Sequence, residues 1–320
     1  MKKWLCLLSV LLLAAGCAAN PKAPETTPEA TPEPTAQAES VTLSILGPTG
    51  APALALIAPV KNGHDVTFVD GTDVLQAAFV NPNPEYDILV APSNLGAKLA
   101  ANGKTTYRME SVITWGNLYL VAAEESALEK DGVFAAFGEG AVPGKVLETV
   151  LEKHPVTPEI TWYASVAEVQ GAVLAGKADV ALMAEPAATA TIAKAKENGQ
   201  ELKIILDLQE QWKAVTGTQG YPQAALFVRQ DLPQERQAAV EALLQSIEDY
   251  MNQAQQDPSI VEQDIETIGA QTLGVPSGAV IAKTWSRMNL RLAAAEDVKP
   301  ELTSFLNLFE VTDIESILAH

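Results

Sequence analysis

The chain has 320 residues and a formal net charge of −19, from 21 basic and 40 acidic side chains. Proteins that bind nucleic acid broadly need clustered Lys and Arg, so this charge excludes nucleic acid as a partner. The charge also argues against wide contact with anionic lipid, while a hydrophobic content of 48% is sufficient for substantial cores.

The N-terminus predicts an export signal that ends at a lipidated residue. Lys2 and Lys3 precede a short apolar run, and three small residues then lead to Cys17. This order is typical of a secretory signal, and the run is too short for a transmembrane span. The cysteine after the small residues resembles the lipobox of bacterial lipoproteins, although Ala14 stands where Leu is commonest. Residues 1–16 are therefore predicted to be the signal peptide.

Residues 17–40 are predicted to be the lipidated cysteine and a tether rich in Pro, Thr and Glu. From residue 18 to 40 there are five prolines and no aromatic residue, so little apolar surface is available to offset conformational entropy. The other cysteine, Cys6, leaves with the signal peptide. The body of the protein therefore has no thiol, disulfide or cysteine-based metal site.

From residue 41 the pattern alternates strands with helical stretches, which is typical of parallel α/β units. The first run predicts strands at residues 41–46, 65–69, 86–91 and 117–123. The second run predicts strands at residues 133–137, 160–163, 179–183, 202–206 and 224–229. The repetition predicts two similar lobes, each around its own parallel sheet. From Leu232 onward, apolar residues at helical spacing predict a mostly helical segment.

No sequence motif supports an enzyme. His64, His154 and His320 have no metal-ligating partner at helical spacing. There is no nucleophile elbow or P-loop, and Phe137-Gly-Glu-Gly140 lacks the third glycine of a dinucleotide-binding fingerprint. We therefore expect no catalytic residue, no cofactor and no metal.

Four strand-to-helix junctions carry the residues expected to bind a ligand. In open α/β sheets, ligands bind beyond the carboxyl ends of the strands, where helix N-termini present unpaired N–H groups. The candidates at these junctions are Thr49, Gly50, Ser93, Asn94, Gly140 and Glu185. The serine, the asparagine and the glutamate could equally be helix caps, so both roles stay open.

Residues near the predicted boundaries between the two runs add three more candidates, two of them aromatic. Trp115 and Tyr221 are placed to line a cleft, and Asn117 lies two residues after the tryptophan. Aromatic side chains that line a cleft suit a flat or apolar ligand. Trp162 ends a strand, and core packing explains it better.

These segments resemble those of solute-binding proteins of ABC transporters, in the family of sulfonate, nitrate and thiamine-pyrimidine binders (the SsuA/NMT1-like group). The resemblance rests on Gly47–Leu56, Asp87–Asn94, Trp115–Leu120 and, most specifically, Gly171–Pro186. The last segment combines a Gly-Lys-x-Asp turn, a buried strand and Glu-Pro. The resemblance covers about residues 41–309, and the C-terminal third is less diagnostic.

The resemblance implies an α/β, two-lobed periplasmic-binding-protein type II fold with two hinge crossings. The crossings are expected near residues 119–123 and 221–226. Lobe one would be residues 41–120 plus 226–320, and lobe two would be residues 121–225. Catalysis is not implied, and the enzyme branch of this fold depends on a cysteine-rich motif that this body lacks.

The implied function is the extracytoplasmic capture of a small solute for a membrane permease by a lipid-anchored monomer. A carboxylate at Glu185, with no Arg or Lys at the four junctions, favours a nitrogenous or heteroaromatic solute. A sulfonate- or nitrate-type anion stays open, because helix N-termini can hold anions. A sensor lipoprotein that signals to a membrane receptor and an exported enzyme are the remaining alternatives.

Overall fold

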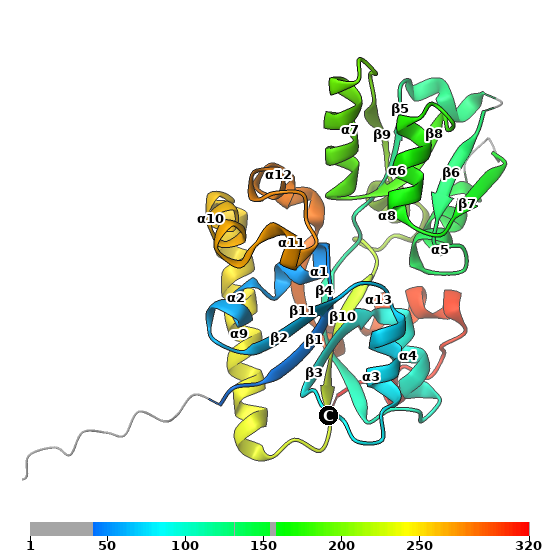
Figure 1. The fold of residues 1–320 in the computed structure, drawn as a ribbon. Coiled ribbons are helices and arrows are strands. Elements are labelled where there is room, and N and C mark those ends of the chain that lie inside the picture. Colours follow the sequence, from blue (N-terminus) through cyan, green and yellow to red (C-terminus); the bar gives the residue numbers. More distant parts are fainter. Residues whose placement is uncertain (1–40, 131, 154–157, 320) are drawn as a thin grey trace, which may run out of the picture. The chain divides into compact units, whose positions relative to one another are not determined.

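The computed structural model describes residues 41–130, 132–153 and 158–319 (Figure 1). Ser40–His320 form one compact unit. Cys17, the signal peptide and the tether lie outside the described residues, so their predictions stay predictions. Within the described part, no helix is both long and apolar enough to span a bilayer.

The first sheet has six strands in the order β11-β4-β10-β3-β1-β2. Their bounds are β1 Ser44–Pro48, β2 Asp65–Val69, β3 Ile88–Pro92, β4 Tyr107–Thr114, β10 Ala224–Arg229 and β11 Leu290–Ala294. Helices on the two faces of this sheet follow from the alternation of its side chains. Leu89 and Phe227 face α3 (Asp73–Val80) and α4 (Ser93–Ala101), whereas Ile88 and Val90 face the long helix α9 (Gln234–Gln256).

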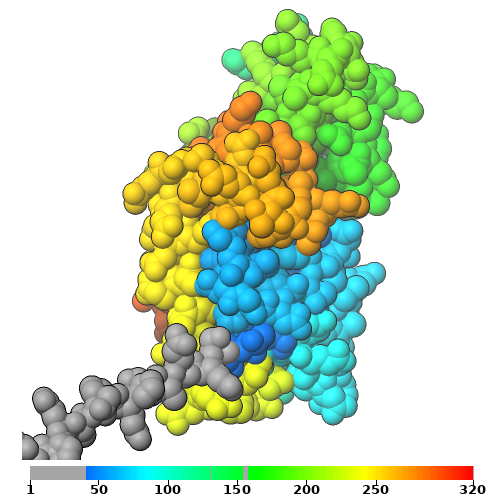
Figure 2. All heavy atoms as spheres, turned by 60° about the vertical axis from the view of Figure 1, so that its left-hand side comes forward, coloured from blue at the N-terminus to red at the C-terminus, as the bar shows by residue number. Residues whose placement is uncertain are grey.

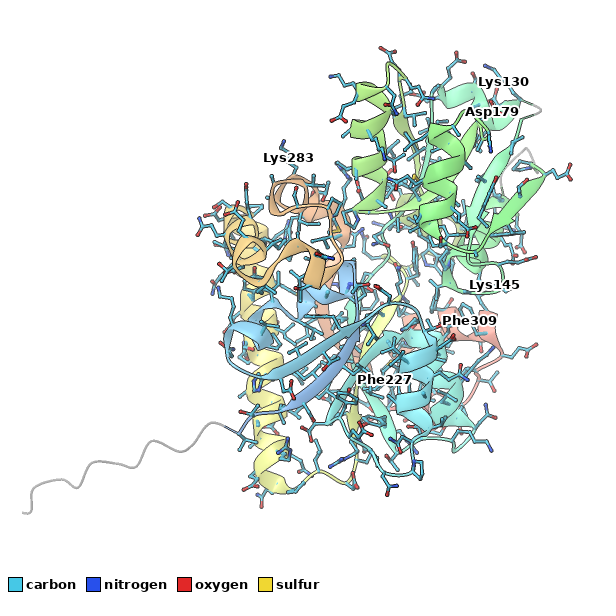
Figure 3. All side chains as sticks on the ribbon, in the orientation of Figure 1. Lys130, Lys145, Asp179, Phe227, Lys283 and Phe309 are labelled. Carbon is cyan, nitrogen blue, oxygen red and sulfur yellow. The ribbon has the colours of Figure 1, made fainter. Side chains whose placement is uncertain are left out.

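Aromatic packing anchors the first of these faces. The ring of Phe227 (labelled in Figure 3) contacts that of Phe79 edge to face, with 5.1 Å between ring centroids. Phe79 meets Tyr107 in the same way at 5.7 Å. Such pairs add about 0.5–1.5 kcal/mol beyond the buried area. They join α3, β4 and β10, which come from three distant parts of the chain.

The second sheet has five strands in the order β7-β6-β8-β5-β9. Their bounds are β5 Leu118–Ala122, β6 Phe134–Phe137, β7 Ile160–Tyr163, β8 Val180–Ala184 and β9 Lys203–Asp207. Its helices are α5 Val142–Leu151, α6 Val166–Leu174, α7 Ala187–Glu197 and α8 Leu208–Thr216, with a 3₁₀ turn η1 at Glu125–Glu129. Ser165 caps α6, since its Oγ accepts the N–H of Glu168 at 3.3 Å.

Both sheets are mixed, so the prediction of two parallel sheets was wrong. The α/β units pair in parallel, as β1 does with β2 and β3, and β6 does with β7 and β8. The strands next to the crossings run the other way: β10 is antiparallel to β3 and β4, and β5 is antiparallel to β8 and β9. β5 and β10 each follow a crossing from the other sheet. Each runs opposite to the strands that pair with it.

The chain passes twice between the sheets, and the two passages pack directly on each other. The first, at residues 115–117, joins β4 to β5 and precedes the expected range. The second, at residues 217–223, joins α8 to β10. A Cβ on Gly116 (φ +92°) would lie 2.5 Å from the Tyr221 ring, and one on Gly220 (φ +77°) would lie 2.5 Å from the Trp115 carbonyl oxygen. Both positions therefore require glycine.

The C-terminal third is mostly helical, as predicted, but it also supplies a strand that the sequence did not reveal. The remaining helices are α1 Ala51–Ala55, α2 Ile57–Lys61, α10 Ser259–Ile268, α11 Ala270–Leu273, α12 Gly278–Thr284 and α13 Lys299–Leu306. The remaining 3₁₀ turns are η2 Trp285–Met288, η3 Ala295–Val298, η4 Asn307–Phe309 and η5 Glu315–Ile317. Figure 2 shows α9 in yellow and α10–α12 in orange beside the blue N-terminal segment. Strand β11, between η2 and η3, forms the edge of the first sheet. Helix α8 also went unpredicted.

A buried ion pair ties the start of the first sheet to α9. Asp87, with 5% of its side chain exposed, accepts hydrogen bonds from Ser44 N at 2.8 Å and from Arg236 Nε at 3.0 Å. Burial alone would raise the pKa of Asp87, but the hydrogen bonds from Arg236 and Ser44 outweigh it and hold that pKa below its usual 3.8. The carboxylate is therefore charged in the folded protein at neutral pH.

We predict that Asp87→Ala lowers the free energy of unfolding by about 1–3 kcal/mol at neutral pH, because the N–H of Ser44 loses its acceptor while Arg236, which is 30% exposed, stays hydrated. A depressed folded-state pKa gives stability that is present above the unfolded value and is lost as the pH falls through the folded value. The difference between variant and wild type should therefore shrink at about pH 3. Urea unfolding of variant and wild type at neutral pH and at about pH 3 measures this difference in the free energy of unfolding. As a control, Glu125→Gln breaks the exposed pair with Lys203 and should cost no more than about 1 kcal/mol.

Candidate functional site

Ser93 fastens the end of β3 to the second crossing. Its Oγ donates to the carbonyl oxygen of Pro222, and its N–H donates to the carbonyl oxygen of Gln223 at 3.1 Å. The side chain is fully buried at the first position of α4. Its neighbour Asn94 lies half-buried in the first turn of the same helix. The strand end and the crossing are thus held at hydrogen-bonding distance.

Glu185 occupies the matching place at the end of β8 in the second sheet. Its side chain is 0% exposed, and its oxygens accept bonds from Thr189 N at 3.0 Å and Thr189 Oγ1 at 2.7 Å. These bonds place the carboxylate at the N-terminus of α7, where the helix dipole favours negative charge. Glu185 is not the N-cap residue of α7, which is Pro186, but its carboxylate satisfies the N–H of Thr189 in the first turn as a cap would.

Arg287, which comes from the side of the first sheet, forms an ion pair with this carboxylate. Its Nε lies 2.8 Å from Glu185 Oε1, and its Nη2 donates to Thr189 Oγ1 at 2.7 Å. Arg287 belongs to η2, next to β11 of the first sheet, whereas Glu185 follows β8 of the second. The arginine side chain is 40% exposed. The guanidinium is thus held by a buried carboxylate while it stays accessible to solvent.

The sequence did not reveal Arg287, because it lies about a hundred positions after Glu185 in a segment expected only to pack. No motif or spacing links the two residues. The one signal for Arg287 was indirect. A buried carboxylate at a strand end requires a cation, and so acidic a chain offers few Arg or Lys residues to supply it. The argument that no cation serves the four junctions does not hold in the folded protein.

Asn117 joins the first crossing to the end of β8. Its Nδ2 donates to the carbonyl oxygen of Glu185 at 2.8 Å, and the N–H of Glu185 donates to the Asn117 carbonyl oxygen at 2.9 Å. Its Oδ1 is buried and has no hydrogen-bond partner among the described residues. A buried acceptor without a donor costs about 1–3 kcal/mol, so this atom is a place where a ligand N–H or a water would be stabilised.

Tyr221 supports the crossings from the inside. It is fully buried, and its hydroxyl donates to Gln209 Oε1 at 2.7 Å. Burial raises its pKa well above the usual value, so the hydroxyl stays protonated. Its ring stacks on Phe305 and meets Trp212 edge to face. Because aromatic rings enclose it, the structure places Tyr221 in the core at the crossings.

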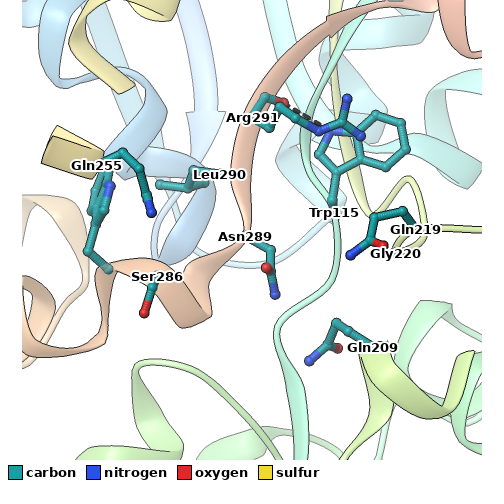
Figure 4. A pocket seen from close by; sticks show the side chains of 10 residues that line it. Trp115, Gln209, Gln219, Gly220, Gln255, Ser286, Asn289, Leu290 and Arg291 are labelled. Carbon is teal, nitrogen blue, oxygen red and sulfur yellow. Dashed lines mark hydrogen bonds between the residues drawn. The ribbon is translucent and has the colours of Figure 1, made fainter. Parts of the chain in front are cut away.

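Trp115 lines a cavity of about 320 Å³ beside the first crossing (Figure 4). Its Nε1 donates to the Arg291 carbonyl oxygen at 2.9 Å, and the guanidinium carbon of Arg291 lies 4.0 Å from its ring centroid. Gln219, Asn289 and Ser286 also border the cavity. Trp115 and Glu185 thus belong to different surroundings, since Glu185 does not line this cavity.

Thr49, Gly50 and Gly140 lie in loops that make no hydrogen bond to the crossings among the described residues. Thr49 Oγ1 donates to Asp70 Oδ1 at 2.6 Å, and Gly50 N donates to the Leu273 carbonyl oxygen at 2.8 Å. The loop of Thr49 and Gly50 therefore contacts the last residue of α11. Gly140 is exposed in the turn before α5, with φ at +68°. Their contact with a ligand stays a prediction.

Taken together, the crossings gather neutral and paired groups that suit binding. The buried polar atoms are hydroxyls, amides and one carboxylate paired to a guanidinium. No three metal-ligating side chains come together anywhere in the described ranges. Such a set can hold and orient a small molecule through hydrogen bonds and one charge.

Comparison with known proteins shows which fold this chain has. No protein-family model and no curated protein matches the chain. Among solved structures, an ABC transporter protein from Parabacteroides distasonis is 22% identical, covering 86% of this chain and 94% of that one, with a TM-score of 0.69. The periplasmic aliphatic sulphonate binding protein SsuA from Escherichia coli is 15% identical over 87% and 92% of the two chains, with a TM-score of 0.63.

A third similar structure is the alkanesulfonate-binding protein SsuA from Xanthomonas axonopodis pv. citri, bound to MOPS. It is 15% identical to this chain, with 88% of this chain and 97% of that one covered and a TM-score of 0.59. At these identities the likeness concerns the fold. The fold that the sequence resemblance implied is confirmed: this chain has the two-lobed α/β fold of type II periplasmic binding proteins, with two crossings.

Proposed function

We propose that this protein is the extracytoplasmic substrate-binding component of an ABC importer. The supporting observation is that strand ends of both sheets hydrogen-bond to the two crossings, Ser93 to the second and Glu185 to the first. A movement of one sheet relative to the other therefore moves groups at both strand ends. Ligands of open α/β sheets bind at such ends, and a ligand that contacts both sheets favours the closed arrangement.

The proposed solute site lies between a lobe of residues 41–120 with 226–320 and a lobe of residues 121–225. The strand-end residues Thr49, Gly50, Ser93, Asn94, Gly140 and Glu185 would border it, with Trp115 and Asn117 at the crossings and Tyr221 supporting them from the core. Asn117 supports this placement best, because its buried Oδ1 lacks a donor. The fold requires no catalytic group for this function, so we propose binding without turnover.

Two classes of solute are compatible with the site. A nitrogenous or heteroaromatic solute would use the Glu185 carboxylate and the Asn117 Oδ1 as acceptors of its N–H groups. For this, the solute must displace Arg287 from Glu185. A sulfonate- or nitrate-type anion would instead bind the accessible guanidinium of Arg287, which Glu185 holds in place. The second class is favoured by the 40% exposure of Arg287, and the binding of sulfonates by SsuA proteins agrees with it.

We propose further that Cys17 carries a lipid anchor and that residues 18–40 tether the binding protein near its permease on the outer face of the cell membrane. The lipobox-like pattern and the proline-rich composition support this proposal. A permease receives solute from the closed protein, whereas a membrane receptor would make the same protein a sensor. We favour transport because the similar structures include ABC transporter proteins.

We predict that residues 41–320 are stabilised by a member of a panel of sulfonates, nitrate, pyrimidines and amines. A ligand at 100 times its dissociation constant should add about 2.7 kcal/mol to the free energy of unfolding, because it binds the native state alone. Thermal unfolding with each compound measures this. An unchanged midpoint across the whole panel would contradict solute binding, and turnover of a panel member would contradict binding without catalysis.

We also predict that Glu185→Ala weakens solute binding at least about tenfold, corresponding to about 1.4 kcal/mol, without unfolding the protein. Titration calorimetry measures the affinity, and circular dichroism checks the fold. Glu210→Ala, an exposed glutamate in the first turn of α8, is the matched control and should bind normally. Arg287→Met separates the solute classes: it should abolish binding of an anion but leave a nitrogenous solute bound. Full affinity in both the Glu185 and Arg287 variants would place the solute elsewhere.

A further inference from the structure

Of the residues proposed for the solute site, only Trp115 also lines the cavity beside the first crossing. Its lining comes from both crossings, α8, α9, η2 and β11. A neighbouring hollow of about 410 Å³ shares Gln255, Leu290 and Arg291 with it and continues along β11. Thr49, Ser93 and Glu185 line neither space. Figure 4 shows Arg291 beside Trp115, and Asn289 lies between this pair and Ser286.

Charge distinguishes this cavity from the rest of an acidic protein. The chain has 40 acidic residues, yet none of the ten residues that line the cavity is acidic. Arg291 is its one charged side chain, and it makes no ion pair within the described residues. Glu248, at the far side of Arg291, lines only the neighbouring hollow.

Arg291 lies over an aromatic ring, and its N–H groups are available. Its guanidinium carbon is 4.0 Å from the Trp115 ring centroid, within the range of a cation–π contact, and its exposed side chain makes no hydrogen bond to another described residue. Burial lowers the pKa of Arg291, and the more distant Glu301 partly opposes this effect. The group stays charged, and an anion at its edge would replace the lost hydration.

Neutral hydrogen-bonding groups complete the lining. The side chains of Gln219, Gln255 and Ser286 are exposed at the cavity, and none makes a side-chain hydrogen bond to another described residue. Asn289 donates its Nδ2 to the Gly116 carbonyl oxygen at 2.8 Å, which leaves its Oδ1 as an acceptor. Amides and a hydroxyl around one guanidinium match a ligand that has one carboxylate and several hydroxyl groups.

We propose that this cavity is a second ligand site, which shares only Trp115 with the solute site and takes a small hydroxylated carboxylate. The carboxylate pairs with the edge of Arg291, and the hydroxyls bond to Gln219, Gln255, Ser286 and Asn289. An occupant would connect η2 and β11 to the first crossing, where Asn289 already bonds to Gly116. If the proposed function holds, the occupant and the solute change each other's affinity by the same factor.

Titration calorimetry with gluconate tests the site directly, and needs no knowledge of the solute. Gluconamide is the matched neutral compound. We expect gluconate to bind with a dissociation constant of about 1 mM or below, and gluconamide at least about tenfold more weakly. Arg291→Met should weaken gluconate at least about tenfold, and Arg291→Lys should weaken it less, because the charge remains without the planar fork.

Two controls keep the test specific. Arg108→Met removes a guanidinium of β4 that bonds to the carbonyl oxygens of Thr105 and Tyr107, away from the cavity, and should leave gluconate binding unchanged. Glu185→Ala should leave it unchanged too. Equal affinity for gluconamide, full affinity in a folded Arg291→Met variant, or no gluconate binding up to about 10 mM would overturn the proposal. Loss in Glu185→Ala with none in Arg291→Met would place the carboxylate in the solute site, which overturns the second site while the proposed function stands.

Discussion

The close packing of the two crossings is the constraint on which the rest of the structure depends. Gly116 and Gly220 let residues 115–117 and 217–223 approach to backbone contact, where any side chain would collide with the Tyr221 ring or the Trp115 carbonyl. The two crossing segments, held in this contact, act as one connection between the sheets. They can bend together, but the groups fastened to them, such as Ser93 and Asn117, stay in register with both sheets.

This constraint explains why the functional groups at the crossings come from distant parts of the sequence. The first crossing has β11 and η2 on one side and the second crossing on the other, so its flank is built by the C-terminal third. Arg287 and Arg291 both belong to this flank, four residues apart. One is neutralised by a buried glutamate of the other sheet, and the other lies over an indole without an acidic partner in the described residues.

Most of the α/β units were predictable from sequence because their strands and helices show their own periodicity, as at β3, β8 and α9, whereas β4 and α8 were missed. Their direction was not, since antiparallel pairing of β5 and β10 depends on which sheet a strand comes from. Strand β11 was missed because five residues beside helical turns carry no pattern of their own. The polar residues at the crossings were found from strand ends, whereas their arginine partners depend on tertiary contacts that spacing does not encode.

The different surroundings of the two arginines have a consequence for how this fold can respond to ligands. Arg287 reaches across the sheets to Glu185, so a ligand that competes for either group alters a contact between the sheets. Arg291 makes its contacts within the first sheet and the first crossing, so a ligand there acts on the connection instead. A change at the crossings affects both the open and the closed arrangement of the sheets. It shifts the equilibrium between the two arrangements only if the crossings pack differently in the open and in the closed arrangement. Because Asn289 donates to the Gly116 carbonyl oxygen and Trp115 is itself part of the crossing, such a difference would arise at the residues where the chain has least room to move.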